Sequence, residues 1–167
     1  RFYSDVAQAG ADSVLLPDVP VREGAPFAAA AEAAGVDQIF IAPPHASEET
    51  LAGVAQHSRG YIYAVSRVGV TGAEWESSTD GLADVVANLK RFGGVPPLLG
   101  FGISTPTHVA DAVAAGAAGA ISGSAITALI AQHCSDSPGE RRTVDDIDTL
   151  KAELREFVAA MKAATRR

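Results

Sequence analysis

Short, continuously apolar runs recur along the chain, and each follows a glycine that ends a helical stretch. Gly10, Gly35 and Gly60 introduce the first three runs at equal intervals of 25 residues. Glycine suits the position after a helix because it adopts the left-handed conformation at little cost. Continuous rather than alternating apolar runs are typical of strands buried on both faces of a parallel sheet. The five predicted strands are residues 12–16, 37–41, 61–65, 97–101 and 117–122.

Helix signals fill the intervals between these runs. Pro26 stands at the start of an alanine-rich stretch, where proline is favoured. Ser47 and Thr105 are suitable N-terminal caps, and residues 82–89 carry apolar side chains at helical spacing. The predicted helices cover residues 1–7, 26–34, 80–92, 105–115, 124–133 and 144–164, with one more beginning after Ser47, and residues 135–142 form a polar, exposed loop.

The strict alternation of strands and helices predicts an α/β fold with a parallel sheet covered by helices. Two architectures fit, an open doubly wound sheet and a (β/α)8 TIM barrel. No G-x-G-x-x-G follows the first strand, which disfavours the open dinucleotide-binding form. A barrel needs eight units and roughly 250 residues, whereas this chain supplies five units in 167 residues. We therefore expect residues 1–167 to be the C-terminal portion of a single TIM-barrel domain, with the first units lying ahead of Arg1.

Composition and charge exclude several classes. Apolar residues make up 47% and charged residues 20% of the chain, as in globular proteins, and no run reaches the roughly 18 apolar residues of a membrane helix. A net charge of −7 argues against general nucleic-acid or membrane binding, but not against one small anion. The single cysteine, Cys134, excludes an internal disulfide and fits the cytoplasm. The four histidines lack metal-ligand spacing, so no metal is expected.

Two glycine-bearing loops are the strongest chemical signal. A barrel binds phosphate at the loops after its last two strands and at the start of a short extra helix. Residues 100–104 and 121–125 follow the last two predicted strands, and a short helix begins at the second loop. Gly102 and Gly123 allow backbone N–H groups to approach an anion, and Ser124 adds a hydroxyl where the helix dipole favours negative charge. The glycines alone are equally suited to tight turns; the recurrence on consecutive strands favours phosphate.

Three further features bear on function. The long connection after residue 65 carries glycines and the only tryptophan, which indicates a closing lid or an ordinary surface loop. Asp18 follows the first strand and lies, in a barrel, on the active face; catalytic, interface and anchoring roles remain open for it. Tyr63 lies within a strand, where a phenol usually packs and its hydroxyl needs a partner.

Together these motifs resemble the α subunit of tryptophan synthase. The matching stretches are residues 12–20, 41–44, 60–63, 66–72, 100–104 and 116–125. The resemblance implies a lyase that cleaves indole-3-glycerol phosphate to indole and glyceraldehyde 3-phosphate by a retro-aldol step, without a metal or organic cofactor. It also implies an α2β2 complex in which the β subunit carries pyridoxal phosphate and receives the indole.

The resemblance also implies roles for individual residues. The substrate phosphate is expected on Gly72, Gly102, Gly123 and Ser124. Tyr63 and Phe101 are expected to line the substrate pocket, with Phe101 near the indole ring. Residues 66–78 match the family's lid, including Arg67 and Thr71, and Asp18 matches its surface toward the β subunit.

The family's two catalytic carboxylates, a glutamate and an aspartate, match nothing in this chain and are expected ahead of residue 1. The reaction needs a group that moves a proton and an anion that stabilises the cationic indole nitrogen. Glu74 is a poor substitute because a lid does not hold an acid/base group in register. We therefore expect no catalytic residue here and no activity of these residues alone. The alternatives are another phosphate-binding barrel, such as a sugar-phosphate isomerase or epimerase, and a non-catalytic phosphate-binding fragment.

Overall fold

In the computed structural model, which describes residues 1–65, 81–135 and 143–166, strands and helices alternate as predicted. Every pair of neighbouring strands is parallel. The strands are β1 (Ser13–Leu15), β2 (Asp37–Ile39), β3 (Ile41–Ala42), β4 (Ile62–Val65), β5 (Pro97–Gly100) and β6 (Gly119–Ala120). The helices are α1 (Phe2–Gln8), the short 3-10 helix η1 (Val21–Glu23), α2 (Ala25–Ala34), α3 (Glu48–His57), α4 (Leu82–Arg91), α5 (Pro106–Ala114), α6 (Ser124–Gln132) and α7 (Ile147–Ala163).

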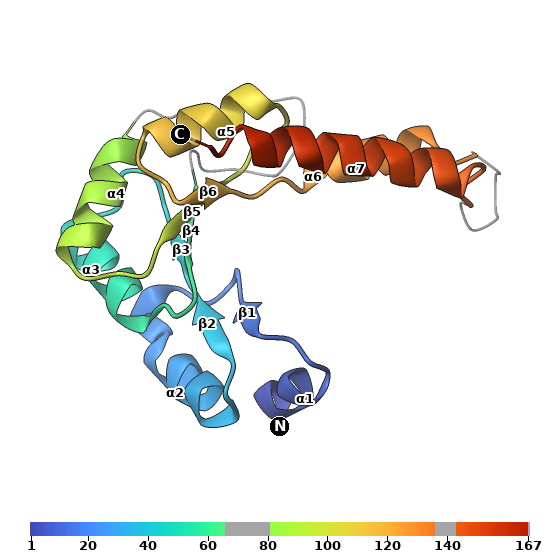
Figure 1. The fold of residues 1–167 in the computed structure, drawn as a ribbon. Coiled ribbons are helices and arrows are strands. Elements are labelled where there is room, and N and C mark those ends of the chain that lie inside the picture. Colours follow the sequence, from blue (N-terminus) through green and yellow to red (C-terminus); the bar gives the residue numbers. More distant parts are fainter. Residues whose placement is uncertain (66–80, 136–142, 167) are drawn as a thin grey trace.

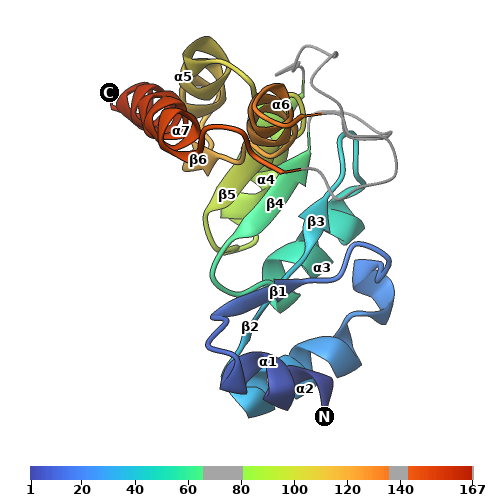
Figure 2. The ribbon, with the colours of Figure 1, turned by 90° about the vertical axis from the view of Figure 1, so that its right-hand side faces the viewer.

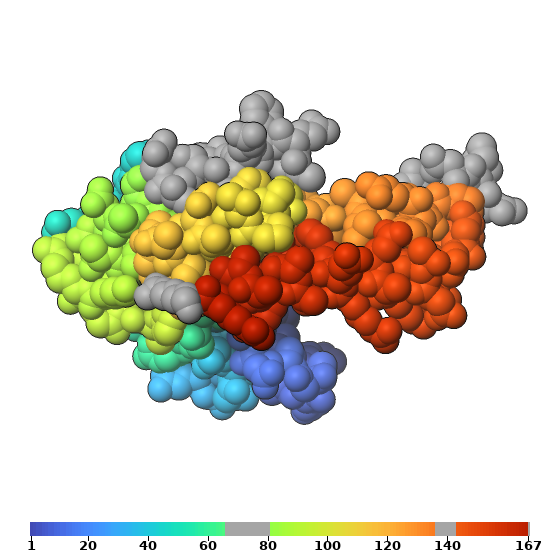
Figure 3. All heavy atoms as spheres, turned by 45° about the horizontal axis from the view of Figure 1, so that its top comes forward, coloured from blue at the N-terminus to red at the C-terminus, as the bar shows by residue number. Residues whose placement is uncertain are grey.

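The strands form a curved wall with helices on its outer side. In Figure 1, α2, α3, α4 and α5 follow one another around the convex side of the strands, while α1 and α7 lie at the two ends of the arc. Figure 3 shows α7 lying against α5 and α6, and both contacts are present in the structure. A curved parallel sheet wrapped by helices is the arrangement of a TIM barrel.

The predicted strand 37–41 is two strands rather than one. β2 pairs with β1, whereas β3 pairs with β4, so the run passes from a two-stranded sheet into a four-stranded sheet of order β3-β4-β5-β6. The change of partner occurs at Phe40, whose carbonyl accepts the Tyr63 N–H at 3.1 Å. The prediction of a single strand was wrong because the apolar pattern is the same on both sides of this change of neighbour.

Two clusters of buried side chains hold the helices on the sheet. One joins Leu99 on β5 to α4, α5 and α7 and includes Ile103, in the turn after β5. The other joins Ile62 on β4 to Leu51 on α3 and to α4. Because Ile103 is only 3% exposed, the loop after β5 is anchored in the core one residue beyond Gly102.

The predicted caps are confirmed, and the last helix differs in detail. The Ser47 hydroxyl accepts the Thr50 N–H at 3.2 Å, and the Thr105 hydroxyl accepts the His108 N–H at 3.3 Å. α7 begins later than predicted because the Asp146 carboxylate caps it. Leu150 and Met161 on α7 are buried, whereas Val158 is 52% exposed. Among the helices of the described ranges, none has the length and apolar character to cross a membrane.

Candidate active site

The carboxyl ends of β4, β5 and β6 lie together at one edge of the sheet. Tyr63 on β4 pairs with Leu98 on β5, and Leu98 pairs with Gly119 on β6. The loops after β5 and β6 therefore start side by side. Figure 2 shows the three strands next to one another, with α6 beyond them. In a barrel this edge carries the active site.

The turn after β5 contains two consecutive residues in the left-handed conformation. Phe101 has φ 68° and Gly102 has φ 72°. This conformation costs glycine little, but a bulky side chain such as that of Phe101 adopts it only when its surroundings impose it. Strain of this kind collects at binding sites, and sequence reasoning missed it because nothing in the local pattern marks Phe101 for a positive φ.

Tyr63 and Phe101 form an aromatic pair at this turn. Their ring centroids are 6.2 Å apart and their planes meet at 86°, a favourable edge-to-face arrangement. The Tyr63 hydroxyl lies over Gly100, where a Cβ would collide with the phenol. Burial, with a smaller contribution from Tyr61, raises the pKa of Tyr63, and a hydrogen bond from the Phe101 backbone partly opposes this. The phenol is therefore neutral at physiological pH.

The turn after β6 leads directly into α6. Gly123 precedes the helix and is exposed, and a Cβ on it would meet no atom within 4 Å. α6 has no side-chain cap. Because the first N–H groups of a helix have no partner within it, those of Ser124 and Ala125 are available to an anion at the positive end of the helix dipole.

A side chain that sequence reasoning did not single out joins the two turns. The Ser122 hydroxyl donates a hydrogen bond of 2.7 Å to the carbonyl of Ile103. The next residue, Ser104, is held in turn by its N–H, which donates to His108 Nδ1 at 3.3 Å. In the sequence, Ser122 is marked only by its place before a glycine. Its hydrogen-bond partner, Ile103, lies 19 residues away, so the sequence does not indicate this contact.

Asp18 lies apart from these turns, after β1 of the other sheet. It is exposed in a tight turn that the Val19 N–H closes on the Leu16 carbonyl at 3.3 Å. Beside it is a hollow of about 290 Å³ whose lining includes Pro17, Val19 and Phe40. An exposed carboxylate next to a hollow that is lined mainly by apolar side chains, with Arg22 and Thr50 among them, is suited to contact with another protein.

The remaining predicted residues, Arg67, Thr71 and Gly72, fall within 66–80, and so lie outside the described residues, as does most of the predicted loop 135–142. Among the described residues, no group of three or more His, Cys, Asp or Glu side chains could hold a metal ion.

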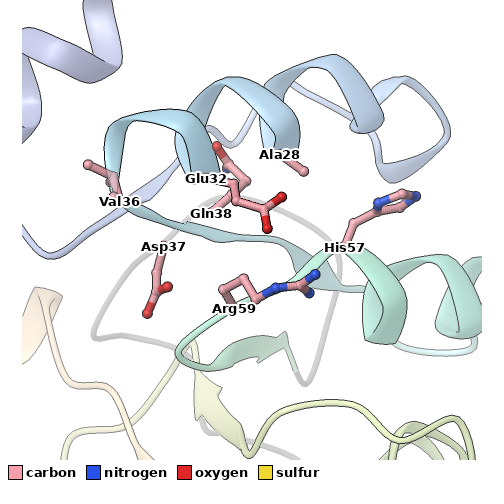
Figure 4. Close-up of a pocket in the computed structure, with 8 residues that line it drawn as sticks. Ala28, Glu32, Val36, Asp37, Gln38, His57 and Arg59 are labelled. Carbon is pink, nitrogen blue, oxygen red and sulfur yellow. The ribbon is translucent and has the colours of Figure 1, made fainter.

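A second hollow, of about 300 Å³, lies at the opposite end of the sheet. Figure 4 shows Glu32 on α2, Asp37 at the start of β2, His57 at the end of α3 and Arg59 just beyond it around this hollow. The buried residue here, Gln38, accepts a hydrogen bond from the Tyr3 hydroxyl at 2.6 Å, which ties α1 to the sheet. Its amide nitrogen donates to the carbonyl of Val14 on the neighbouring strand β1 and to that of Ile39 on its own strand. These contacts give Gln38 a structural role, as expected at the amino ends of barrel strands.

Comparisons with known proteins agree with this geometry. The sequence profile of a family described as "Tryptophan synthase alpha chain" matches residues 1–165. Curated proteins of that name from Corynebacterium glutamicum and Shewanella oneidensis are 66% and 50% identical over 100% and 98% of this chain, which covers 60% and 55% of their lengths. The chain thus spans less than two thirds of the relatives it matches.

Solved structures give the same result. The aminoacrylate-bound tryptophan synthase of M. tuberculosis superimposes with a TM-score of 0.74 at 25% identity, over 99% of this chain and 55% of that one. A chain of the tryptophan synthase a2b2 complex from Pyrococcus furiosus gives a TM-score of 0.76 at 26% identity, over 97% of this chain and 60% of that one. The fold class is therefore the TIM barrel of these tryptophan synthase chains. The matches do not support the alternative of a sugar-phosphate isomerase or epimerase.

Proposed function

Since this chain belongs to the tryptophan synthase alpha chain family, we propose that the protein containing it cleaves indole-3-glycerol phosphate to indole and glyceraldehyde 3-phosphate. One observation carries the proposal. The turn after β5 holds Phe101, which pairs with the ring of Tyr63, directly beside Gly102, which belongs to one of the two glycine turns. A substrate with an indole ring at one end and a phosphate at the other needs these two features side by side.

The phosphate binds, in this proposal, between the two glycine turns. Backbone N–H groups of Gly102, Gly123 and Ser124 and the Ser124 hydroxyl are its donors, and Gly72 is the further donor that the family suggests. The open space at Gly123 leaves room for the phosphate oxygens. The uncapped start of α6 adds a favourable dipole.

The indole ring lies against Tyr63 and Phe101. Because the pKa of Tyr63 is raised by burial, its phenol presents a neutral, mostly apolar surface. The resemblance to the family assigns residues 66–78, with Arg67 and Thr71, the role of a lid that keeps water from the substrate.

Carboxylates from outside residues 1–167 perform the proton transfer in this proposal. One takes the proton of the glycerol hydroxyl and protonates the indole carbon, and the other stabilises the cationic ring nitrogen. The support is that the chain spans about 60% of the length of its curated relatives. Residues 1–167 supply binding groups, and on their own they have no lyase activity. No cofactor is needed for this step.

The partner in this proposal is a tryptophan synthase β chain, which carries pyridoxal phosphate and uses the indole. Asp18 and the apolar hollow beside it form the contact surface on this side. One structural relative is described as part of an a2b2 complex. The protein works in the cytoplasm, in keeping with a free Cys134 thiol.

The experiment that tests the function compares Gly123→Asp with Gly123→Asn in the full-length protein bound to the β chain. Both side chains enter open space, but only aspartate places a negative charge at the anion site. We expect the KM for indole-3-glycerol phosphate to be about tenfold or more higher for Gly123→Asp than for Gly123→Asn, because like charges brought together cost several kcal/mol. Absence of indole release by the wild type, or equal KM values for the two variants, contradicts the proposal.

A further inference from the structure

One side chain, that of Ser122, connects the two glycine turns beyond the end of the sheet. Backbone pairing between β5 and β6 ends where the Ile121 N–H donates to the Leu99 carbonyl at 2.8 Å. Beyond this point, within the described part of the chain, the next hydrogen bond between the two segments is that from the Ser122 hydroxyl to the Ile103 carbonyl, at 2.7 Å. The side chain therefore continues the pairing into the loops.

On the β5 side, this bond fixes the far end of the left-handed turn. Phe101 and Gly102 lie between the last residue of β5 and Ile103, whose side chain is 3% exposed in the core. The Ser122 hydroxyl and His108 Nδ1, the latter at 3.3 Å from the Ser104 N, hold the same peptide unit, that between Ile103 and Ser104. This unit fixes the far end of the turn that carries the Gly102 N–H, and the end of β5 at Gly100 fixes the near end.

On the β6 side, the same bond fixes the start of α6. Ser122 immediately precedes Gly123, so anchoring it fixes where the first N–H groups of the helix point. Its hydroxyl proton is committed to the Ile103 carbonyl, and Ser122 is therefore not a donor to a ligand in this arrangement. Ser124, the first residue of α6, has no such commitment.

We propose that Ser122 is a positioning residue that sets the separation of the Gly102 N–H from the N–H groups of Gly123 and Ser124, so that all three bind one phosphate group. The inference rests on the proposed function and deepens it. Two turns held at a fixed separation bind an anion without first losing the freedom to move apart, and such preorganisation raises affinity.

The test uses the full-length protein and titrates inorganic phosphate while the amide NMR signals of Gly102, Gly123 and Ser124 are followed. Ser122→Ala removes the bond, and Ser122→Thr keeps the hydroxyl. Thr165→Ala is the matched control, because the Thr165 hydroxyl also donates to a backbone carbonyl, that of Lys162, at 2.8 Å, but at the end of α7.

We expect Ser122→Ala to raise the phosphate Kd about five- to tenfold, the effect of one lost hydrogen bond, and the other two variants to stay within about twofold of the wild type. The KM for indole-3-glycerol phosphate rises by the same factor, with a smaller change in kcat. A purely structural role lowers the melting temperature of Ser122→Ala but leaves the phosphate Kd of its folded form unchanged, and that result overturns the inference.

The remaining outcomes are separable. If phosphate shifts none of the three signals in the wild type, the proposed function loses its phosphate site and the inference fails with it. If the wild type binds phosphate and Ser122→Ala binds it equally well, only the inference fails. If Ser122→Ala does not fold, Ser122→Cys replaces it, because a thiol is a weaker donor; an intermediate Kd supports the inference and a wild-type Kd overturns it.

Discussion

The phenol ring of Tyr63 occupies the space that a side chain on Gly100 would need. A Cβ built on Gly100 collides with the hydroxyl and the ring of Tyr63 on the neighbouring strand. Gly100 has an ordinary strand conformation, so this glycine is required by the close approach of the ring rather than by backbone freedom. The two positions are therefore coupled: one must be small for the other to be aromatic.

This coupling predicts a non-additive pair of substitutions. We expect Gly100→Ala to lower the free energy of unfolding by about 1–3 kcal/mol, the usual cost of overpacking. The cost of Gly100→Ala should be smaller when Tyr63→Ala has already emptied the space, giving a favourable coupling energy in a double-mutant cycle. Urea denaturation of the four proteins measures it. Gly119→Ala is the control, because a Cβ there meets only the flexible end of Leu98, at 3.3 Å. Additive effects at Gly100 and Tyr63 contradict the prediction.

His45 holds a second strained position, in the loop after β3. Its φ is 56°, and the side chain is exposed. We expect His45→Gly to raise the free energy of unfolding by about 0.5–1 kcal/mol, because the left-handed conformation costs a residue with a Cβ roughly 1–2 kcal/mol and the flexibility of glycine offsets part of the gain. The neighbouring Ala46→Gly, at a residue without a positive φ, should instead lower stability. Denaturation midpoints that fall for both variants contradict the strain at His45.

Local features were predictable from the sequence because neighbouring residues determine them. Ser47 and Thr105 cap helices through N–H groups three residues away, and both caps form as predicted. Gly35 ends α2 as predicted, with φ 71°. α3 instead ends at Ser58 in an extended conformation, and Gly60, with φ 68°, lies in the turn beyond it. The parallel arrangement followed from the order of elements alone.

Features that depend on partners far along the chain could not be predicted. The change of sheet at Phe40 depends on which strand lies beside it, and the pattern of apolar residues does not encode that. Ser122 and Ile103 are 19 residues apart, and nothing in either segment marks the hydrogen bond. Within the candidate site, the glycines could be identified from their types and spacing, whereas the strain at Phe101 is imposed by packing.

Asp18 provides a test of the partner surface. We expect Asp18→Asn to weaken binding of the β chain roughly five- to tenfold, because a charge at the edge of an interface contributes modestly to affinity. The phosphate Kd should not change. Titration of the β chain measures the effect, and Asp12→Asn is the control, an exposed acid that precedes β1 where Asp18 follows it. A Kd for the β chain that falls or stays constant in Asp18→Asn, or rises equally in both variants, contradicts the assigned surface.

The buried Tyr3 and the partly buried Tyr63 predict the behaviour of the protein in alkali. Burial raises the pKa of both Tyr63 and Tyr3 above the ordinary value of 10.0. The unfolded chain therefore loses these protons at a lower pH than the folded protein, so that above about pH 10 the unfolded state binds fewer protons and stability falls as pH rises. Below that pH the stabilisation is fully present. We expect the free energy of unfolding to decline as the pH rises above about 10, and to decline less steeply in Tyr63→Phe. Tyr3→Phe reports the other phenol separately, and parallel curves for wild type and both variants contradict the raised pKa values.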